Sequence, residues 1–584
     1  MKVSFPRQQT LDYLSFTKIF ALRLWPWYIC GVLFLALTNL ITVKIPRLAG
    51  AITDNFASSP SRELEKWAIT IIGLGLLQII CRTLSRVLIF WPGRQIEAHS
   101  KTSIFSHTIL LPEAIIERFG IGDLISRLAN DLSQLRVFFA FATLQVFNLI
   151  FLMTFTINQM WEISPHLTAV CLAPLSAMVV LTRIFIPKLQ AFNKQNQVAL
   201  GSLTNYVTET FTNVHLVKSN GAESSFAKRC DNHIEDVYQA NVRVIILRTI
   251  LFPLISTLAA LSQVLVLFYG GHLIVEGFLK VGDLLAFNIY IGTLAFPLTS
   301  VGLVLSIYQR GKTALERLNE ITSEPTEEQS DSENPRESKI LIEIKNLTFQ
   351  YPQSKNRKPA LENLTMTVRE GEKIGIIGPV GAGKTTILNL IFRLYDPPKQ
   401  TVFLSGQDIT EIPPTQIRSL MNYALQSPHL FSNSIRDNLN FGLKKKIPPP
   451  LLEEAAKKAV IIEDIMGFPE KWETPVGEKG IRLSGGQKQR LALARLFTRD
   501  SNVWLLDDVM SAVDTKTEET MIEKIFTTKK TLIVSSHRPN VLKKCKTIFY
   551  LYEGELIDCG DYDSLLKRHQ NLQEFMHDAS QSQK

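Results

Sequence analysis

The balance of hydrophobic and polar residues changes sharply near the middle of the chain. The first half contains long apolar runs, and the second half has the mixed pattern of a soluble α/β domain. Each apolar run is close to the roughly 20 residues that an α-helix needs to cross a bilayer. We therefore predict six transmembrane helices, at Trp25–Val43, Trp67–Trp91, Val137–Ile157, Ile163–Ile186, Ile245–Val275 and Asp283–Ser306.

The first apolar run resembles a signal peptide, because a polar segment with Lys18 and Arg23 precedes it. Its length matches a bilayer crossing, however, and no small-residue cleavage site follows within it. We expect it to be the first transmembrane helix.

Two long hydrophilic stretches, residues 92–136 and 187–243, separate the second helix from the third and the fourth from the fifth. Both are rich in Arg and Lys, whereas the short connection Gln159–Glu162 contains neither. The positive-inside rule therefore places these stretches and the N-terminus in the cytoplasm. Their apolar residues recur at helical spacing. Connectors this long are uncommon, so we favour helical intracellular extensions over plain amphipathic surface helices.

Segment 323–338 is acidic, contains Ser and Pro, and has almost no large apolar residue. This composition is typical of a flexible linker. The predicted organisation is an all-α transmembrane domain at residues 1–315, a linker at 316–339 and an α/β domain with a P-loop at 340–584.

The net charge of +9 and the pI near 9.0 raise the question of nucleic-acid binding. The basic residues are scattered, with no aromatic-interleaved stripe. Membrane proteins collect Lys and Arg in cytoplasmic loops, so we expect a membrane protein with no nucleic-acid partner. The six cysteines show no CxxC pair and no metal-ligand spacing, and we interpret them as structural.

The chemistry of the second half centres on a phosphate-binding loop. A short apolar strand, Lys373–Gly378, runs into Gly378–Thr385, which matches GxxxxGK[ST], and an apolar helix follows. The glycines let successive N–H groups face the phosphates, Lys384 supplies charge to the β- and γ-phosphates, and the Thr385 hydroxyl ligates Mg²⁺. We predict a site for ATP and Mg²⁺.

Two further motifs follow in order along the chain. Val503–Asp507 reads as a buried strand ending in a carboxylate, the form of the acid that helps to hold Mg²⁺. Ser484–Gln487, with two glycines at the start of a helix, reads as a second anion site. One chain has little use for two phosphate sites. Two chains arranged head to tail would each cap the ATP on the other's P-loop, so nucleotide would bridge a dimer.

With these motifs, the sequence resembles the half-transporters of ATP-binding cassette (ABC) exporters over nearly its whole length. The resemblance implies that Tyr351 stacks on adenine, that Gln426 contacts Mg²⁺ and senses the membrane domain, and that His537 grips the γ-phosphate. It also implies a D-loop at Ser511–Asp514 and an exporter-specific segment at Thr474–Gly480 that meets the transmembrane domain.

The same resemblance implies two coupling helices in the hydrophilic stretches. We expect them around Gly122–Arg136 and Thr204–Glu223.

One residue departs from the family pattern. In most active cassettes of this family, the Asp that helps to hold Mg²⁺, which corresponds to Asp507 here, is followed directly by Glu. This chain has Asp508 at that position. The shorter side chain sets the carboxylate more than about 1 Å back from the attacking water, and a misplacement of that size costs on the order of a hundredfold in rate. The chain thereby resembles the impaired-site subunit of heterodimeric bacterial multidrug or lipid exporters, which completes the competent site on its partner. The alternative is that a backbone shift compensates and the site is fully active.

Polar residues within the apolar runs are candidates for a substrate path, although snorkelling or helix–helix bonding also explains them. The chain has no N-terminal Cys-protease domain, which disfavours a leader-processing peptide exporter, and importers usually carry the two domains on separate chains. The apolar helices suit a hydrophobic or amphipathic substrate and suit lipid contact equally well. The candidates are Arg82, Arg86, Gln145, Asn148, Gln263 and Asn288.

The sequence predicts that this chain hydrolyses ATP to export or flip a hydrophobic or amphipathic substrate across the cytoplasmic membrane. It would do so as one half of a dimer, and we favour a heterodimer. A homodimer with two active sites and a regulatory ATP-sensing subunit are the alternatives. The predicted catalytic residues are Asp508, His537 and Gln426, and the Mg²⁺ ligands are Thr385, Gln426 and Asp507. The predicted ATP-binding residues are Tyr351, Gly378, Pro379, Val380, Gly381, Ala382, Gly383, Lys384, Thr385, Thr386, Ser484, Gly485, Gly486 and Gln487.

Overall fold

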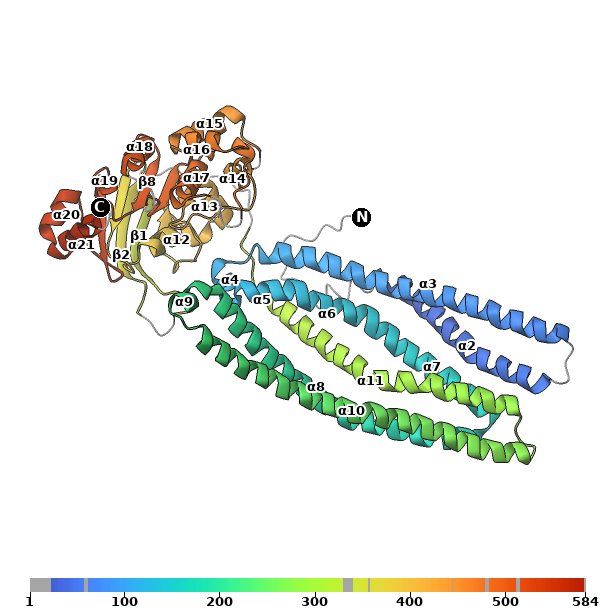
Figure 1. Cartoon of the computed structure of the whole chain (residues 1–584). Helices are drawn as coiled ribbons and strands as arrows, with labels where there is room; N and C mark the ends of the chain where they lie inside the picture. Colours follow the sequence, from blue (N-terminus) through green and yellow to red (C-terminus); the bar gives the residue numbers. More distant parts are fainter. Residues whose placement is uncertain are drawn as a thin grey trace. The chain divides into compact units, whose positions relative to one another are not determined.

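The computed structural model describes residues 23–56, 61–328, 340–354, 358–443, 445–477, 483–510 and 515–581. The chain forms two compact units (Figure 1). The first comprises Met1–Ile109 and Gly122–Glu324, and the second comprises Leu110–Ile121 and Pro325–Lys584. Each unit is described by itself.

The first unit is a bundle of long helices. Five helices are long and apolar enough to cross a membrane, among the residues described. Each contains all or nearly all of one of the first five predicted crossings, which confirms a helical, multi-pass transmembrane region. The sixth predicted crossing lies within α11 (Val281–Thr322), which begins with the apolar segment Val281–Leu294. The five are α2 (Trp25–Asn55), α3 (Ser61–Thr108), the run Ile121–Ile163 that ends in α7 (Thr143–Ile163), α8 (Pro165–Thr212) and α10 (Glu223–Val275).

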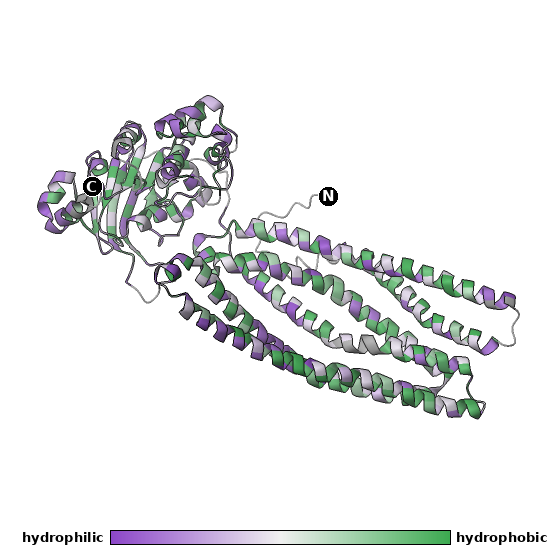
Figure 2. Ribbon diagram, in the orientation of Figure 1, coloured by the Kyte–Doolittle hydropathy of each residue, from purple (hydrophilic) through white to green (hydrophobic). Residues whose placement is uncertain are grey.

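The long helices extend well beyond a bilayer. The 53 residues of α10 span about 80 Å at 1.5 Å per residue, against a hydrocarbon core of about 30 Å. In Figure 2 the hydrophobic residues of α8 and α10 gather away from α9 (Val214–Ser219), and hydrophilic residues dominate close to it. The hydrophilic stretch at 187–243 is therefore a helical continuation of the two crossings.

Neighbouring helices of the bundle pack on one another around buried side chains. Helices α8 and α10 lie side by side along their length, α2 packs on α3, and α11 contacts both α2 and α7 (Figure 1). The buried cluster of the bundle includes Phe287, Tyr290 and Met178. The Tyr290 hydroxyl donates to the carbonyl oxygen of Val43 at 2.8 Å, which satisfies a polar group within an apolar interior.

The predicted position of the first coupling helix is wrong. Segment Gly122–Arg136 is part of a continuous helical run made of α5 (Ile121–Ser126), a π-helical turn and α6 (Leu132–Val137), because its apolar residues pack into the bundle. The short helix in this stretch is instead α4 (Glu113–Phe119), which ends at Gly120 with φ +77°. In the second expected segment, Thr204–Glu223, the structure has a short helix, α9, and its role as a coupling helix stays a prediction.

The predicted linker also begins too early. Helix α11 continues to Thr322, because Leu318 and Ile321 extend its buried face. The extended part begins after the helix, and residues 329–339 lie outside the described residues.

The second unit contains two sheets. The six-stranded sheet has the order β10-β9-β3-β8-β7-β6, parallel except for β10 at its edge. The smaller sheet is antiparallel, in the order β2-β1-β4-β5. The strands are β1 (Ile340–Phe349), β2 (Leu361–Arg369), β3 (Lys373–Ile377), β4 (Val402–Leu404), β5 (Gln407–Asp408), β6 (Met421–Ala424), β7 (Val503–Asp507), β8 (Thr531–Ser535), β9 (Thr547–Tyr552) and β10 (Glu555–Gly560).

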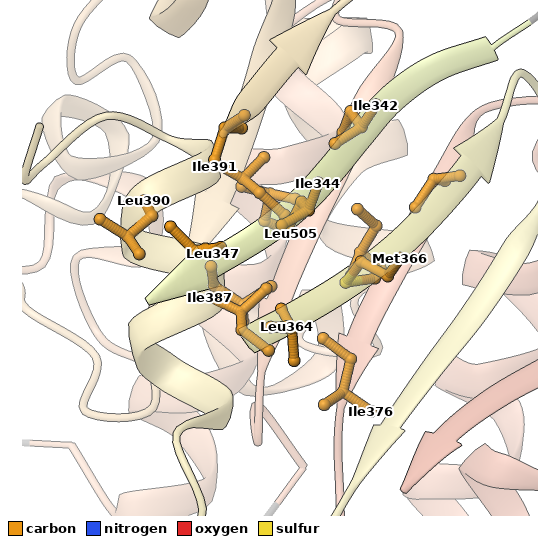
Figure 3. Close-up of a cluster of buried hydrophobic side chains, with 14 of the residues drawn as sticks. Ile342, Ile344, Leu347, Leu364, Met366, Ile376, Ile387, Leu390, Ile391 and Leu505 are labelled. Atoms are coloured by element: carbon orange, nitrogen blue, oxygen red, sulfur yellow. The ribbon is translucent and has the colours of Figure 1, made fainter. Parts of the chain in front are cut away.

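The burial of the strands follows their places in these sheets. Every residue of β7 and β8 is buried, as expected for central parallel strands covered on both faces, whereas β2 alternates between buried and exposed residues. Helix α12 (Lys384–Ile391) contributes to a shared core with Ile344 of β1, Leu364 of β2 and Leu505 of β7 (Figure 3). This core fixes the first turn of α12, where the phosphate-binding loop ends.

The remaining helices complete the second unit. They are α13 (Pro414–Leu420), α14 (Ile435–Leu439), α15 (Pro449–Lys458), α16 (Ile462–Gly467), α17 (Gly485–Thr498), α18 (Thr515–Phe526), α19 (Pro539–Leu542), α20 (Tyr562–Arg568) and α21 (Gln570–Gln581).

Candidate nucleotide site

The phosphate-binding loop joins β3 to α12 and requires glycine for two physical reasons. Gly381 and Gly383 have φ of +85° and +96°, a region that side chains disfavour. A Cβ on Gly378 would lie 2.2 Å from the carbonyl oxygen of Leu551, so the backbones approach too closely for any side chain. The loop ends at the N-terminus of α12, whose unpaired N–H groups and dipole favour an anion.

Lys384 folds back over this loop. Its Nζ donates to the carbonyl oxygens of Gly378 at 2.7 Å and Pro379 at 2.9 Å. Burial lowers the pKa of the ammonium group, and the nearby carboxylates of Asp507 and Asp508 oppose that shift. A cation held inside a loop of N–H donors is poised to exchange its carbonyl partners for phosphate oxygens.

Asp507 and Thr385 supply oxygen atoms beside the loop. The Thr385 hydroxyl donates to Asp507 Oδ2 at 2.8 Å. Burial raises the pKa of Asp507, while hydrogen bonds from Thr385 and Ser535 lower it. A carboxylate and a hydroxyl are the hard oxygen ligands that Mg²⁺ prefers, so these residues fit the ion.

Gln426 reaches the same edge of the sheet. Strand β6 pairs in parallel with β7, with Ala424 opposite Leu506. Gln426 follows the end of β6 by two positions, and its side chain is exposed. The parallel pairing brings the end of β6, which precedes Gln426, beside the end of β7, where Asp507 and Asp508 lie.

Asp508 and His537 form a close pair at the ends of β7 and β8. Asp508 Oδ1 lies 3.2 Å from His537 Nδ1, and the Asp508 N–H donates to the carbonyl oxygen of Ser535 at 2.9 Å. Asp508 has φ +45°, a conformation that Asp tolerates better than most residues. The shortened acid therefore lies next to the histidine that the family resemblance assigns to the γ-phosphate.

Tyr351 lies next to the start of α12. Its hydroxyl donates to Thr386 Oγ1 at 3.1 Å, which gives Thr386 a partner other than phosphate. Its ring meets Tyr395 edge-to-face at a centroid distance of 5.0 Å. The Tyr395 hydroxyl in turn bonds Glu117 of α4, and burial together with this carboxylate raises the pKa of Tyr395. An aromatic cluster thus joins the predicted adenine platform to α4 within the second unit.

A cavity of about 430 Å³ adjoins this aromatic cluster. It is lined by the start of α4, by Pro325–Glu328 and by the segment before α13. None of the P-loop residues lines it, so the cavity is separate from the predicted phosphate site.

The signature residues form a second helix N-terminus, at α17. Ser484 caps the helix, with its Oγ accepting from the Gln487 N–H at 3.2 Å, and Gln487 Oε1 accepts from the Ser484 N–H at 3.0 Å. This reciprocal capping box leaves the Ser484 hydroxyl proton free to donate. Within the part of the chain that the structure describes, no hydrogen bond or ion pair joins these residues to the P-loop. The two predicted anion sites thus lie on different helices, α12 and α17.

Two expected segments fall partly or wholly outside the described residues. They are the D-loop, Ser511–Asp514, and the end of the exporter-specific segment after Gly477.

Sequence reasoning missed two charged contacts near this site. The Glu518 and Arg538 side chains form an ion pair and are 3% and 9% exposed. Asp464 of α16 contacts both Gln487 and Arg490 of α17. The position of Arg538 directly after His537, in a segment expected to be buried, could have indicated that it needs a charged partner. No feature of the sequence around Asp464 indicates its contacts.

The candidates for a substrate path are dispersed in the bundle. Asn148 Oδ1 accepts from Asn39 of α2 at 3.1 Å, which is a helix–helix contact, and Arg82 and Arg86 are exposed on α3. Sequence reasoning missed a similar contact, in which Gln78 of α3 donates to the Thr42 hydroxyl at 2.6 Å. Gln145, Gln263 and Asn288 are half-buried on α7, α10 and α11.

Comparison with known proteins gives a consistent result. The model of the ABC transporter transmembrane region matches residues 28–298, and the ABC transporter model matches residues 361–511. The chain is 29% identical over 557 residues to the probable multidrug resistance ABC transporter ATP-binding/permease protein YheI of Bacillus subtilis, covering 93% of each. It is 29% identical over 521 residues to the ATP-dependent lipid A-core flippase of Pseudoalteromonas translucida, covering 88% of this chain and 89% of that protein.

A solved structure shows the same fold. A bacterial Atm1-family ABC exporter with ATP bound superposes with a TM-score of 0.78 at 23% identity, over 95% of this chain and 98% of that chain. The chain therefore belongs to the ABC transporters, as an exporter half-transporter that joins a transmembrane region to an ATP-hydrolysing domain.

Proposed function

We propose that this chain is one half of a dimeric exporter that uses ATP to export or flip a hydrophobic or amphipathic molecule across the cytoplasmic membrane. The ATP-binding unit and both termini would lie in the cytoplasm. The names of the relatives, multidrug resistance and lipid A-core flipping, support this class of substrate.

In the proposed mechanism, the N–H groups at the start of α12 and the Lys384 ammonium bind the phosphates of ATP, and Tyr351 stacks on adenine. Thr385, Asp507 and Gln426 would hold Mg²⁺, which neutralises phosphate charge when bound. Asp508 would orient the attacking water, and His537 would contact the γ-phosphate.

The observation that carries the dimer is the second anion site at α17. Ser484 Oγ accepts from the Gln487 N–H, which leaves its hydroxyl proton available as a donor. A helix N-terminus with a free hydroxyl and two glycines suits a terminal phosphate. We assign that phosphate to ATP on the P-loop of a second half-transporter.

We further propose that the partner is a different chain and that this chain's own ATP turns over slowly. Asp508 is one methylene shorter than the usual Glu and lies 3.2 Å from His537 Nδ1. A carboxylate drawn toward the histidine and set back from the attacking water lowers the rate of hydrolysis without removing any group that binds ATP.

The test begins with purification of the tagged chain from its native membrane and mass spectrometry of the complex. We expect a second half-transporter in equal amount. A dimer of this chain alone with vigorous ATPase activity and transport would contradict the heterodimer.

The variant Asp508→Glu then tests the shortened acid. We expect hydrolysis at this chain's own site to rise, by up to about a hundredfold, as measured by single-turnover release of phosphate. Asp508→Asn is the matched control, because it keeps the length and removes the charge, and its rate should fall. An unchanged rate in Asp508→Glu would contradict the role given to the short side chain.

A further inference from the structure

We infer that Asp464 is a positioning residue for the signature sequence and thereby controls ATP turnover at the site on the partner's P-loop. The inference rests on the proposed function, in which α17 caps ATP bound to a second half-transporter. Asp464 lies on α16, which is next to α17 in the second unit (Figure 1).

The Asp464 carboxylate divides its two oxygen atoms between two turns of α17. Oδ1 accepts from Gln487 Nε2 at 2.8 Å, and Oδ2 lies 3.0 Å from an Arg490 guanidinium nitrogen. Residues three apart share one face of a helix, so one carboxylate contacts the first and second turns together. The Asp464 and Arg490 side chains are 25% and 16% exposed, which limits screening of their charges by water.

This contact fixes the direction of the Gln487 amide. A glutamine amide has a donor end and an acceptor end. With Nε2 held by Asp464, Oε1 points to the Ser484 N–H, which it accepts at 3.0 Å. That bond completes the capping box, and the capping box holds Ser484 with its hydroxyl proton free for phosphate.

The carboxylate is not what holds the two helices together. An apolar cluster already packs α16 against α17 and includes Ile461, Ile465, Leu483, Leu491 and Ala494. Arg490 also donates to the carbonyl oxygen of Val460 at 2.6 Å, which keeps its side chain in place. Asp464 therefore orients the side chains at the N-terminus of α17. We expect its removal to disturb that N-terminus before it disturbs the packing of the two helices.

The test uses the full complex of this chain and the partner chain that purifies with it. Each variant is incubated with a photoreactive ATP analogue and vanadate, and the label trapped on each subunit is counted. Asp464→Ala should lower trapping on the partner's P-loop about tenfold, the scale of losing a charge-assisted hydrogen bond. Trapping on this chain's own P-loop and the KM for ATP should stay close to wild type, because ATP first binds the P-loop alone.

Asp464→Asn guards against a folding defect. It keeps the size of the side chain and an oxygen that accepts from Gln487, but it loses the charge that pairs with Arg490, so trapping should fall less than in Asp464→Ala. Glu453→Gln is the matched control, because Glu453 pairs with Lys457 on the neighbouring helix α15 and is 46% exposed. It should trap as wild type does.

Three results would overturn the inference: unchanged trapping in both Asp464 variants, an equal loss on both subunits of a complex of two different chains, or a raised KM with an unchanged kcat. The composition of the complex tests the proposed function separately. If the complex contains this chain alone, the heterodimer is wrong. The inference about Asp464 then predicts a loss of trapping at every site, still with an unchanged KM.

Discussion

The buried pair of Glu518 and Arg538 offers a prediction that ties stability to the ATP site. Arg538 directly follows His537, and Glu518 lies on α18, which begins just after the predicted D-loop. The substitution Glu518→Ala removes the carboxylate and leaves the guanidinium buried. We expect a large loss of stability in the second unit.

The magnitude follows from the burial of both partners. Side chains that are 3% and 9% exposed are largely removed from water, and removing one partner of a buried pair costs about 3–5 kcal/mol. Burial raises the pKa of Glu518, and the Arg538 guanidinium opposes that shift. Replacing a buried ion pair by apolar residues of similar volume is often neutral or stabilising, so a double variant, Glu518→Leu with Arg538→Met, should recover most of the lost stability.

Hydrogen exchange of the full-length protein, followed by mass spectrometry, measures this loss locally. A destabilisation of about 3–5 kcal/mol corresponds to faster exchange by about 150- to 4,000-fold for amides that exchange through opening of the unit. Peptides covering β8 and α18 report it. Asp500→Ala is the control, because it breaks the exposed pair between Asp500 and Lys530 and should change exchange little.

Two outcomes would refute the reasoning. One is an exchange rate in Glu518→Ala no faster than that in the Asp500→Ala control. The other is a double variant less stable than the single variant, since that would mean that the ion pair contributes more than its desolvation costs.

Three further predictions follow from the second unit. Gly383→Ala should abolish binding of a fluorescent ATP analogue, because φ is +96° and the added Cβ would lie 2.6 Å from a leucine side chain. Tyr395→Phe removes the hydroxyl that bonds Glu117 and should loosen α4 by about 1 kcal/mol in hydrogen exchange, with ATP binding unchanged; equal exchange in α4 would contradict this. The hydrogen bond from His569 lowers the pKa of Asp558, so this carboxylate stabilises the fold above its unfolded-state pKa and the contribution is lost as pH falls through its folded-state pKa. Asp558→Asn should flatten that part of an acid-unfolding curve, and an unchanged curve would show that the bond is not formed.

Some properties of this protein depend on local sequence and were predictable from it. The helices that are long and apolar enough to cross a membrane, five among the residues described, follow from the length of apolar runs, because a bilayer imposes that length on any helix that spans it. The phosphate-binding loop follows from the spacing of Gly378, Gly383 and Lys384. The positive φ of Gly383 and the close approach of another backbone to Gly378 disfavour other residues at these two positions. The cap at Ser484 is likewise a contact between residues three apart.

Other properties arose only from tertiary packing. The apolar spacing of Gly122–Arg136 indicates a helix, but only the neighbours of that helix decide that it continues into the bundle and that the short helix is α4. The partners of Asp464 and Glu518 lie about 20 residues away in sequence, at Gln487 and Arg538. Such contacts form where the core brings separate helices and strands together, and hydrophobic periodicity specifies which face of a helix is buried without specifying what covers it.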